Sequence, residues 1–389
     1  MRKIKIRFYI LHYAPIYSGA GSSLEKLVNA IDKKKFDIEI LTTNAKGLPK
    51  IENTDGITII RVGGGPFSNN GMLTKLGKLR FSLSSFLYNF LNFRFDVIFF
   101  IGVGNVSFLS LLLSKLFKKK IITKATGVGS DDPKTIGKSL AGKISIKLME
   151  KNSAHWIISK ELYELTVNHT NWPCENLLLV TNPVNVDYKN YSSLMVERYR
   201  EPRRKIKFLY VGLMSKNKGL DILLNIWVEK KPNAQLILCG PLAINEPELT
   251  NKLIDLAKSN DSIVYEGRIE ANQIRDYYLE CDCFLFPSLR EGLPNVILEA
   301  ISYSLPVISN LLPGITDYIL GSRNERGIVI KNNDINLFEK FIDDFINDSI
   351  FESEMKLKSE LAYNWLLENS ESSIVSSKIE NLVLKLYRK

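Results

Sequence analysis

The sequence is poor in the residues that build disulfide scaffolds and metal centres. Its 389 residues include only four cysteines and three histidines. The cysteines show neither disulfide-framework nor zinc spacing, which is typical of a protein in a reducing compartment: Cys174, Cys239, Cys281 and Cys283. An Asp-x-Asp pair that would hold a metal is also missing. We therefore expect no disulfides, no metal and no other cofactor.

An uninterrupted membrane span is missing as well. Residues 97–114 carry no charge, but Gly102, Gly104 and Asn105 break this run. Its first part, VIFFIGV, is typical of a buried strand, and SFLSLLLSKLFKKK is typical of an amphipathic helix with a cationic end. The opening MRKIKIRFYILHYAP has no small-residue cleavage site of a signal peptide. We expect a cytoplasmic protein.

Basic charge is concentrated in the first half of the chain. Residues 1–190 hold 27 Lys+Arg and 14 Asp+Glu, a net charge of +13, whereas the remainder has 25 against 28, a net of −3. The positive net charge of residues 1–190 favours an anionic partner. Nucleic acid is not expected, because no stretch has the interleaved aromatics or zinc spacing of a nucleic-acid module. An anionic membrane surface, with peripheral attachment at the inner face of the cell membrane, is compatible with the charge.

Residues 74–94 bear on that membrane partner, because they combine cations with Phe, Leu and Tyr. Two interpretations are equally good at this point. The helix lies at an anionic membrane interface, or it is a core helix with a solvated basic edge.

Short apolar runs alternate with helical patterns on both sides of a polar stretch at 187–205. Strands are expected before it at 4–11, 37–43, 57–62, 97–103, 121–126, 155–159 and 177–181. After it they are expected at 206–211, 235–239, 263–266, 283–286, 306–309 and 327–330. This alternation predicts an α/β protein of two doubly wound, Rossmann-like domains with parallel sheets, residues 1–190 and 191–389, that face a cleft. The last stretch, about 334–389, is expected to be helical.

The most informative segment is FLFPSLREGLPNVILEAISYSLPVISN (284–310). A buried strand is expected to end at Phe286, followed by a turn that carries Glu291. Pro294 suits the first turn of the next helix. The backbone N–H groups around Leu293 to Val296 would then form an anion site at the strand's carboxyl end. Carboxylates beside such a site favour ligands with hydroxyl groups, such as a sugar or ribose.

With these residues the sequence resembles the retaining glycosyltransferases of family 4, within the glycosyl transferases group 1. The shared signature is Pro287-Ser288, the run Glu291-Gly292-Leu293-Pro294, then Glu299-Ala300 and Pro306-Val307. The resemblance implies the GT-B fold. It also implies that Glu291 contacts the transferred sugar, that Glu299 binds the ribose, and that residues Gly292, Leu293, Pro294 and Asn295 line the donor site.

Further segments match the family over nearly the whole chain. VGLMSKNKGLD (211–221) resembles the turn that holds the donor diphosphate, with Lys218 in place and Leu213 where the family has arginine. Lys216 is a candidate second cation. Near the amino end, Ser18-Gly19 stands where the family has a glycine pair, so Gly19 is expected to approach a phosphate. Arg268, after Gly267, is expected beside the nucleotide base.

The acceptor side of the sequence departs from the family pattern. Many family members carry a histidine in the region that here reads KATGVGSDDPKTI (124–136). Asp131 and Asp132 are therefore the candidates for acceptor contacts, and helix capping ahead of Ile136 is an equally good interpretation of them. In the family TNPVN (181–185) ends the first domain, and the last helix is expected to pack back toward that domain.

The resemblance implies a metal-independent, retaining transfer of a sugar from a UDP- or GDP-sugar, with Glu291 and Lys218 as catalytic residues. The expected acceptor is a hydroxyl of a saccharide or lipid-linked saccharide, in the biosynthesis of a bacterial capsule, O-antigen or exopolysaccharide. Two alternatives stay open: a nucleotide-sugar epimerase of the same fold, and a non-catalytic nucleotide- or membrane-binding scaffold.

Overall fold

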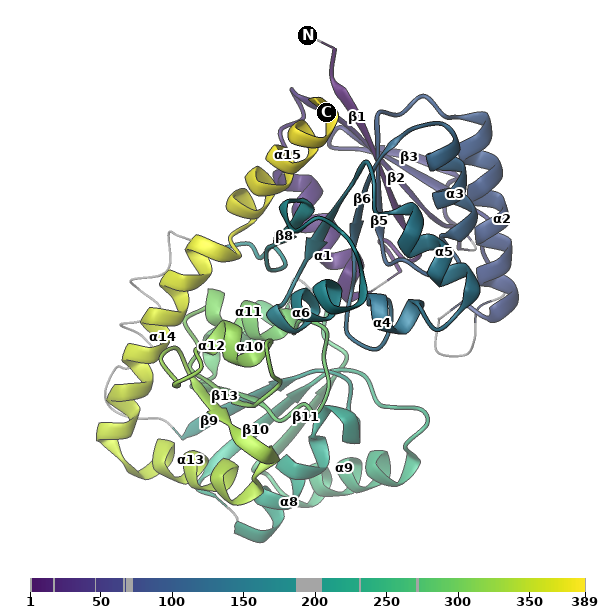
Figure 1. The fold of residues 1–389 in the computed structure, drawn as a ribbon. Coiled ribbons are helices and arrows are strands. Elements are labelled where there is room, and N and C mark those ends of the chain that lie inside the picture. Colours follow the sequence, from purple (N-terminus) through teal and green to yellow (C-terminus); the bar gives the residue numbers. More distant parts are fainter. Residues whose placement is uncertain are drawn as a thin grey trace. The chain divides into compact units, whose positions relative to one another are not determined.

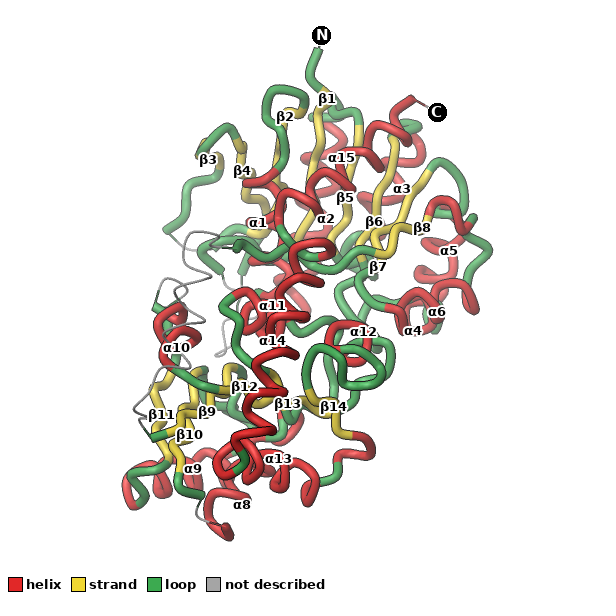
Figure 2. Tube along the Cα trace, turned by 90° about the vertical axis from the view of Figure 1, so that its left-hand side faces the viewer, coloured by secondary structure: helices red, strands yellow, loops and turns green. Residues whose placement is uncertain are grey.

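The computed structural model describes residues 2–16, 18–45, 47–65, 67, 73–186, 205–230, 232–270 and 273–388. Two compact units make up the chain (Figures 1 and 2). The first unit is formed by Met1–Pro183 together with Asn369–Lys389, and the second by Val184–Glu368. The sequence predicts domains 1–190 and 191–389, with the last helix packing back toward the first domain; the units divide at 183–184 and again at 368–369.

The first unit is built on an eight-stranded sheet of order β3-β4-β2-β1-β5-β6-β7-β8. Neighbouring strands are parallel except β3 and β4, which form an antiparallel pair. The strands are β1 (Ile4–Ile10), β2 (Phe36–Thr43), β3 (Ile51–Thr54), β4 (Ile57–Val62), β5 (Val97–Ile101), β6 (Lys120–Lys124), β7 (Ser153–Ile157) and β8 (Leu177–Leu179). Every residue of β5 is buried, as expected for a central strand covered on both faces.

Helices cover both faces of this sheet. They are α1 (Gly19–Ala30), α2 (Lys75–Leu91), α3 (Phe108–Leu116), α4 (Pro133–Ile136), α5 (Leu140–Leu148), α6 (Lys160–His169), the 3-10 turn η1 (Cys174–Asn176), and α15 (Ser372–Arg388). Helix α3 packs between α2 and α5 on one face, and α1 and α15 pack together on the other (Figure 1). Side-chain oxygens cap several amino ends, among them those of Thr74 on α2 and Ser159 on α6.

Helix α15 completes the first unit, although it follows the second unit in sequence. Its buried face packs on α1, β6 and β7: Val375, Ile379, Leu382, Val383 and Leu386. Glu380 accepts a hydrogen bond from the Asp32 backbone N–H at 2.9 Å, and Thr181 donates to the Asn369 carbonyl at 2.8 Å. These contacts explain why the unit includes residues 369–389.

The second unit is built on a six-stranded, fully parallel sheet of order β11-β10-β9-β12-β13-β14. Its strands are β9 (Ile206–Val211), β10 (Ala234–Cys239), β11 (Ile263–Gly267), β12 (Cys283–Phe286), β13 (Val307–Asn310) and β14 (Ile328–Ile330). Its helices are η2 (Lys216–Lys218), α8 (Leu220–Lys230), α9 (Pro247–Ser259), α10 (Ile274–Glu280), α11 (Asn295–Ser302), α12 (Thr316–Leu320), η3 (Lys331–Asn333), α13 (Ile335–Asn347) and α14 (Ser349–Asn369).

One apolar core joins α8, α9, α13 and the start of α14 to one face of this sheet, with Trp227 and Phe345 packed on Phe208. The arrangement confirms the predicted class, two doubly wound α/β domains with a helical carboxyl end. Strand β3 was not predicted. Among the described residues, no helix is long and apolar enough to cross a membrane.

Candidate active site

The loops that follow β9, β10, β11, β12 and β13 meet at one edge of the second sheet, because all of these strands are parallel. The sequence places its donor-site residues on these loops. Glu291 lies in the loop after β12, Lys218 in η2 after β9, and Arg268 directly after β11. The fold therefore brings residues far apart in sequence to the same edge.

Lys218 and Glu291 form an ion pair at this edge. The Nζ atom of Lys218 lies 2.5 Å from Oε1 of Glu291, and the two side chains are 29% and 16% exposed. The buried hydroxyl of Ser288 also lies 3.3 Å from Oε1 of Glu291. Ser288 therefore orients the carboxylate of Glu291, which holds the ammonium group of Lys218 at a partly exposed edge of the sheet.

Gly219 lets the η2 loop approach the β12 loop. Its φ is +72°, and a Cβ atom there would lie 2.3 Å from the carbonyl oxygen of Pro287. The Leu289 N–H donates to the Asn217 carbonyl at 3.0 Å, and Asn310 donates to the Pro287 carbonyl at 2.7 Å. The close approach depends on the missing side chain, so Gly219 sets the distance between Lys218 and Glu291.

The donor-loop residues Gly292, Leu293, Pro294 and Asn295 lead into α11. Leu293 and Pro294 are buried, while Gly292 and Asn295 are half-buried. Pro294 is the residue before the helix rather than a residue of its first turn, and its carbonyl accepts from the Ile297 N–H at 3.1 Å. The first-turn amides of α11 therefore lie at the edge where Glu291 is located, which is the arrangement of an anion site.

Glu299 lies one turn into α11 and is held by a tyrosine. The hydroxyl of Tyr278, which is fully buried, donates to Oε2 of Glu299 at 3.3 Å. Tyr278 also stacks on Tyr303 with ring centroids 5.5 Å apart. The carboxylate of Glu299 is half-buried and thus oriented before any ligand binds.

The outer part of this edge differs from the family pattern. Leu213, in the family's arginine position, is 41% exposed. Lys216 and Arg268 are exposed. Glu246, which the sequence did not single out, accepts from the Lys216 backbone N–H at 2.8 Å. The exposed side chain of Lys216 can reach a ligand, and Glu246 holds the backbone of the same residue in place.

Tyr210, near the carboxyl end of β9, was also missed. It is buried, and its hydroxyl donates to the Leu213 carbonyl at 2.9 Å. Burial raises the pKa of Tyr210 far above its usual range, and the negative charge of Glu291 raises it further. The phenol stays neutral at every physiological pH, so its role is to hold the loop that carries Leu213.

In the first unit, Gly19 is the first residue of α1. Gly19 is exposed, and the Ser18 side chain caps the helix by accepting from the Gly21 N–H. The tight position is Gly21, where a Cβ atom would lie 2.9 Å from the His12 carbonyl oxygen. In this loop it is therefore Gly21, and not Gly19, whose backbone packs closely against the backbone of His12.

Asp131 and Asp132 both organise the loop after β6. Asp131 is buried and accepts hydrogen bonds from the N–H groups of Thr126 and Gly127. Burial raises its pKa, although these bonds oppose the shift. Asp132 caps α4 by accepting from the Thr135 N–H. Burial raises the pKa of Asp132, but its hydrogen bonds outweigh burial and lower it overall. The structure thus shows the capping role for Asp132, and acceptor contacts stay a prediction.

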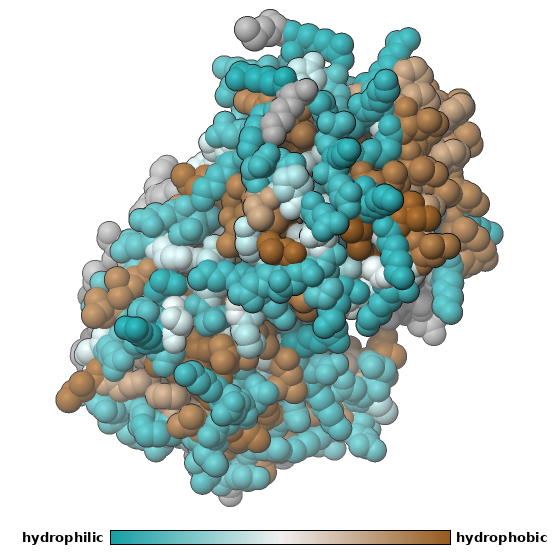
Figure 3. All heavy atoms as spheres, viewed as in Figure 1, coloured by the Kyte–Doolittle hydropathy of each residue, from teal (hydrophilic) through white to brown (hydrophobic). Residues whose placement is uncertain are grey.

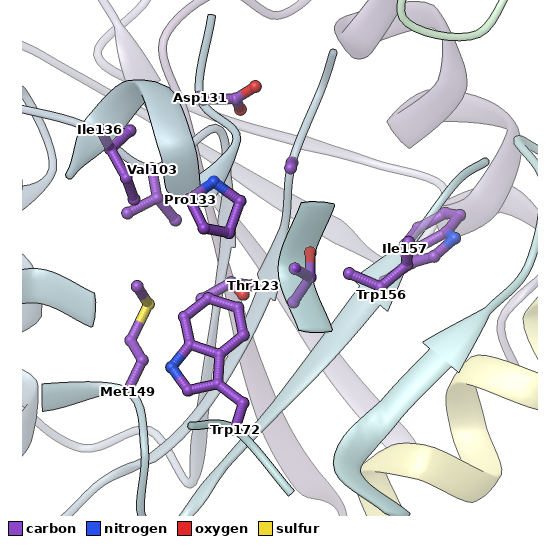
Figure 4. Close-up of a pocket in the computed structure, with 11 residues that line it drawn as sticks. Val103, Thr123, Asp131, Pro133, Ile136, Met149, Trp156, Ile157 and Trp172 are labelled. Atoms are coloured by element: carbon purple, nitrogen blue, oxygen red, sulfur yellow. The ribbon is translucent and has the colours of Figure 1, made fainter. Parts of the chain in front are cut away.

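A pocket in the first unit lies next to Asp131 (Figure 4), which stands at one end of a mostly apolar lining. The lining tryptophans use their N–H groups on backbone carbonyls, Trp156 on Val180 and Trp172 on Ile146. Thr123 is bound to His155 at 2.7 Å. With its polar groups already paired, this pocket is a gap in packing and a poor site for a sugar.

Polar atoms without partners gather elsewhere in the first unit, at the carboxyl ends of β1 and β2. Both ring nitrogens of His12, Oγ1 of Thr43 and Oδ1 of Asn44 are buried and make no hydrogen bond with the residues that the structure describes. The Thr43 N–H donates to the Leu11 carbonyl, so these residues are neighbours. Burial lowers the pKa of His12, helped by the charge of Lys78, and keeps its ring neutral. In the sequence, the one sign of this cluster was that His12 directly follows a predicted strand.

Metal ligands do not cluster in the described part of the chain. No group of three or more His, Cys, Asp or Glu side chains there is close enough to hold an ion. The four cysteines are free thiols, and Cys174 is the exposed one.

Comparison with known proteins adds to this geometry. Residues 194–362 match the family "Glycosyl transferases group 1". An uncharacterized glycosyltransferase of Haemophilus influenzae is 25% identical over 367 residues, which are 92% of this chain and 94% of that protein. CapM of Staphylococcus aureus, a capsular polysaccharide biosynthesis glycosyltransferase, is 27% identical over 142 residues, 36% of each chain.

Among solved structures, HepE of Anabaena in complex with UDP and glucose is similar over 98% of this chain and 100% of its own, with a TM-score of 0.71 and 14% identity. The resemblance to group 1 glycosyltransferases is confirmed, and the fold is of the GT-B type. The assignment to family 4 and the retaining mechanism stay predictions.

Proposed function

We propose that this chain moves a sugar from a UDP- or GDP-sugar to a hydroxyl group, with retention at the anomeric carbon. The match of residues 194–362 to the glycosyl transferases group 1 supports this proposal. The observation that carries the proposal is the Lys218–Glu291 pair, 2.5 Å apart and partly exposed at the carboxyl edge of a parallel sheet. A cation and a carboxylate side by side suit a ligand that carries both phosphate and hydroxyl groups.

The charges of Lys218 and Glu291 offset each other in the ion pair. When a nucleoside diphosphate sugar binds, the ammonium group of Lys218 turns to the diphosphate, and the carboxylate of Glu291 accepts hydrogen bonds from sugar hydroxyls. Lys218 then stabilises the charge that develops on the departing diphosphate, together with the first-turn amides of α11. These groups are fixed before the reaction, so little reorganisation is needed as the bond breaks.

Glu299 fits the second role that the resemblance implies. A ribose offers two neighbouring hydroxyl donors, and a half-buried carboxylate already oriented by Tyr278 accepts them well. Arg268 lies directly after β11, the outermost strand on one side of the same sheet, and the nucleotide base is proposed to lie beside it. Gly19 belongs to the first unit, and its contact with the donor phosphate is part of the proposal.

The reaction proposed here needs no metal, since Lys218, Lys216 and helix amides supply the positive charge. No strong protein base is needed either. The acceptor hydroxyl attacks on the face from which the diphosphate leaves, and the leaving phosphate takes the proton. The C–O bond to the phosphate breaks, a C–O bond to the acceptor forms, and the nucleoside diphosphate leaves as an anion.

The acceptor is proposed to be a saccharide or a lipid-linked saccharide in bacterial surface polysaccharide assembly, at the inner face of the cell membrane. The similarity to a capsular polysaccharide glycosyltransferase supports this class of product. Asp131 and Asp132 remain the acceptor-side candidates, and the neutral ring of His12 adds a group that can both donate to and accept from hydroxyls.

The proposal is tested with Lys218→Ala and Glu291→Ala, each assayed for binding of UDP- and GDP-sugars by calorimetry and for transfer to lipid-linked saccharides. Both variants are expected to lose most transfer, at least about a hundredfold, while the fold survives. The matched control is the pair Lys230–Glu339, 3.0 Å apart on α8 and α13 of the same unit. Transfer at near wild-type rates by either site variant would overturn the assignment, and epimerised donor formed without acceptor would favour the epimerase.

A further inference from the structure

Helix α2 has its faces reversed relative to an ordinary surface helix. The side chains it buries are mostly small or polar: Gly77, Phe81, Ser82, Ser85 and Asn89. The side chains it exposes include a stripe of large apolar residues: Leu76, Leu79, Leu83, Leu87, Phe90 and Leu91. Leu83 and Leu91 are 52% and 67% exposed. Surface helices normally place the apolar stripe inward, so this arrangement needs a cause.

The cause is a buried polar network that fixes the rotation of α2. Arg7 on β1 is 2% exposed and donates to Glu39 at 2.7 Å and to Asn89 at 2.9 Å. Asn89 in turn donates to Ser110 on α3 at 3.2 Å, and Ser85 bonds to the hydroxyl of Tyr9 at 3.2 Å. Turning the leucines inward would leave the charge of Arg7 short of partners, which is costly in a buried site.

Neighbouring helices extend the apolar surface. Helix α3 packs against α2 and α5 and exposes Leu112 and Leu116, the latter by 75%. Helix α5 exposes Leu140 by 76% together with Ile144. Figure 3 shows apolar side chains gathered on the part of the first unit where Figure 1 places these helices. We name this surface, formed by α2, α3 and α5, the leucine face.

Aromatic rings and cations border the leucine face. Phe93 stacks on Phe117 with centroids 5.2 Å apart, and Lys119 lies 5.0 Å from the ring of Phe95. Residues 56–149 contain 14 Lys+Arg and only three acids: Asp96, Asp131 and Asp132. Asp96 is paired with Arg2, and the other two are buried. Arg61 and Lys124 are themselves buried, and the remaining cations give the surroundings of the leucine face a positive charge.

We propose that the leucine face docks on a lipid bilayer with anionic headgroups, with its leucines inserted at the boundary between headgroups and acyl chains and its lysines and arginines on the headgroups. An exposed apolar patch of this extent marks an interaction surface. Apolar stripes flanked by cations and aromatic rings fit an anionic bilayer. A second copy of the chain fits less well, because two such faces would bring like charges together.

Residues 74–94 are thus proposed to lie at an anionic membrane interface, a role separate from the transfer reaction. The bilayer would hold the first unit where lipid-linked acceptors are found. The donor site lies in the second unit, so loss of docking and loss of donor binding are separate observations.

The test is flotation of the purified full chain with vesicles of phosphatidylcholine alone, or with about one-third phosphatidylglycerol. Wild type is expected to float with the anionic vesicles, and less so as salt rises. The triple variant Leu79→Glu, Leu83→Glu, Leu87→Glu is expected to bind at least about tenfold more weakly. These side chains are already exposed, so the fold is expected to survive. Urea unfolding checks the fold of the first unit in the variant, and UDP-sugar binding by calorimetry checks the second unit.

The matched control is Leu357→Glu with Leu361→Glu, two exposed leucines of α14 in the second unit. Its vesicle binding is expected to equal that of wild type. Equal flotation with neutral and anionic vesicles, or equal losses in the triple variant and the control, would overturn the proposal. So would a wild-type dimer in sedimentation equilibrium that the triple variant abolishes, because the leucine face would then bind a second copy.

Discussion

Replacing Gly219 by alanine is expected to disrupt the donor site through a single added methyl group. The left-handed φ of +72° alone costs an alanine about 1–2 kcal/mol. The new Cβ would also lie 2.3 Å from the Pro287 carbonyl oxygen, where ordinary contacts begin at 3.4 Å. The η2 loop and the β12 loop must therefore separate by about 1 Å, with overpacking of about 1–3 kcal/mol.

Gly267 provides a matched control for this change. It has the same φ of +72°, but nothing lies within 4 Å of the position where its Cβ would be. Gly267→Ala is therefore expected to lower the free energy of unfolding by the conformational cost alone, about 1–2 kcal/mol. Gly219→Ala is expected to lower it by roughly 2–5 kcal/mol in total. The difference between the two variants isolates the contact with Pro287.

The assays are urea unfolding followed by tryptophan fluorescence, and kcat/KM for transfer. A displacement of about 1 Å between Lys218 and Glu291 is expected to lower kcat/KM about a hundredfold in Gly219→Ala. Gly267→Ala is expected to keep most of its activity. Equal unfolding midpoints for the two variants, or full activity of Gly219→Ala, would refute the claim that this glycine sets the geometry of the site.

Three further changes have defined outcomes. Leu213→Arg is expected to strengthen binding of free UDP or GDP about tenfold by calorimetry, since it adds a charge-assisted bond; unchanged affinity would show that the exposed Leu213 does not face the diphosphate. Glu299→Ala is expected to weaken nucleotide binding, and Tyr278→Phe to weaken it less; equal affinity in all three proteins would remove the ribose role. Burial lowers the pKa of His155 to about 3, so the folded protein binds its proton more weakly than the unfolded chain. The contribution of His155 to the free energy of unfolding is complete above pH 6.5 and falls by up to about 1.4 kcal/mol per pH unit below it. In urea titrations at several pH values, His155→Gln should reduce the loss of stability below pH 6.5. An unchanged loss of stability in this variant would contradict the role of His155.

The strand pattern was predictable because parallel strands covered on both faces are continuous apolar runs. Strands expected at 57–62 and 206–211 coincide with β4 and β9, and 283–286 with β12. Strand β3 (IENT) was not predictable from an apolar run, because it is mostly exposed and has a single large apolar residue. Its signal was Asp55-Gly56, where both residues have positive φ, as in a tight hairpin turn.

The positions of Glu291 and Lys218 were predictable because a sequence motif fixes the loops that carry them. Side-chain positions that depend on tertiary contacts were less predictable. Nothing local indicated that Tyr278 would hold Glu299, or that Glu246 would hold the η2 loop. The orientation of α2 was not predictable from its own residues at all. It depends on Arg7, 82 positions before Asn89, and periodicity within a helix does not report such a partner.

The order of synthesis acts against the first unit. Residues 1–183 leave the ribosome first, but α15, which covers α1, β6 and β7, follows only after the entire second unit. The second unit is continuous and can finish folding while the first still exposes the surface that Ile379 and Val383 will cover. A fragment ending at 183 is therefore expected to aggregate, and expressing the first unit alone requires joining α15 to it by a linker.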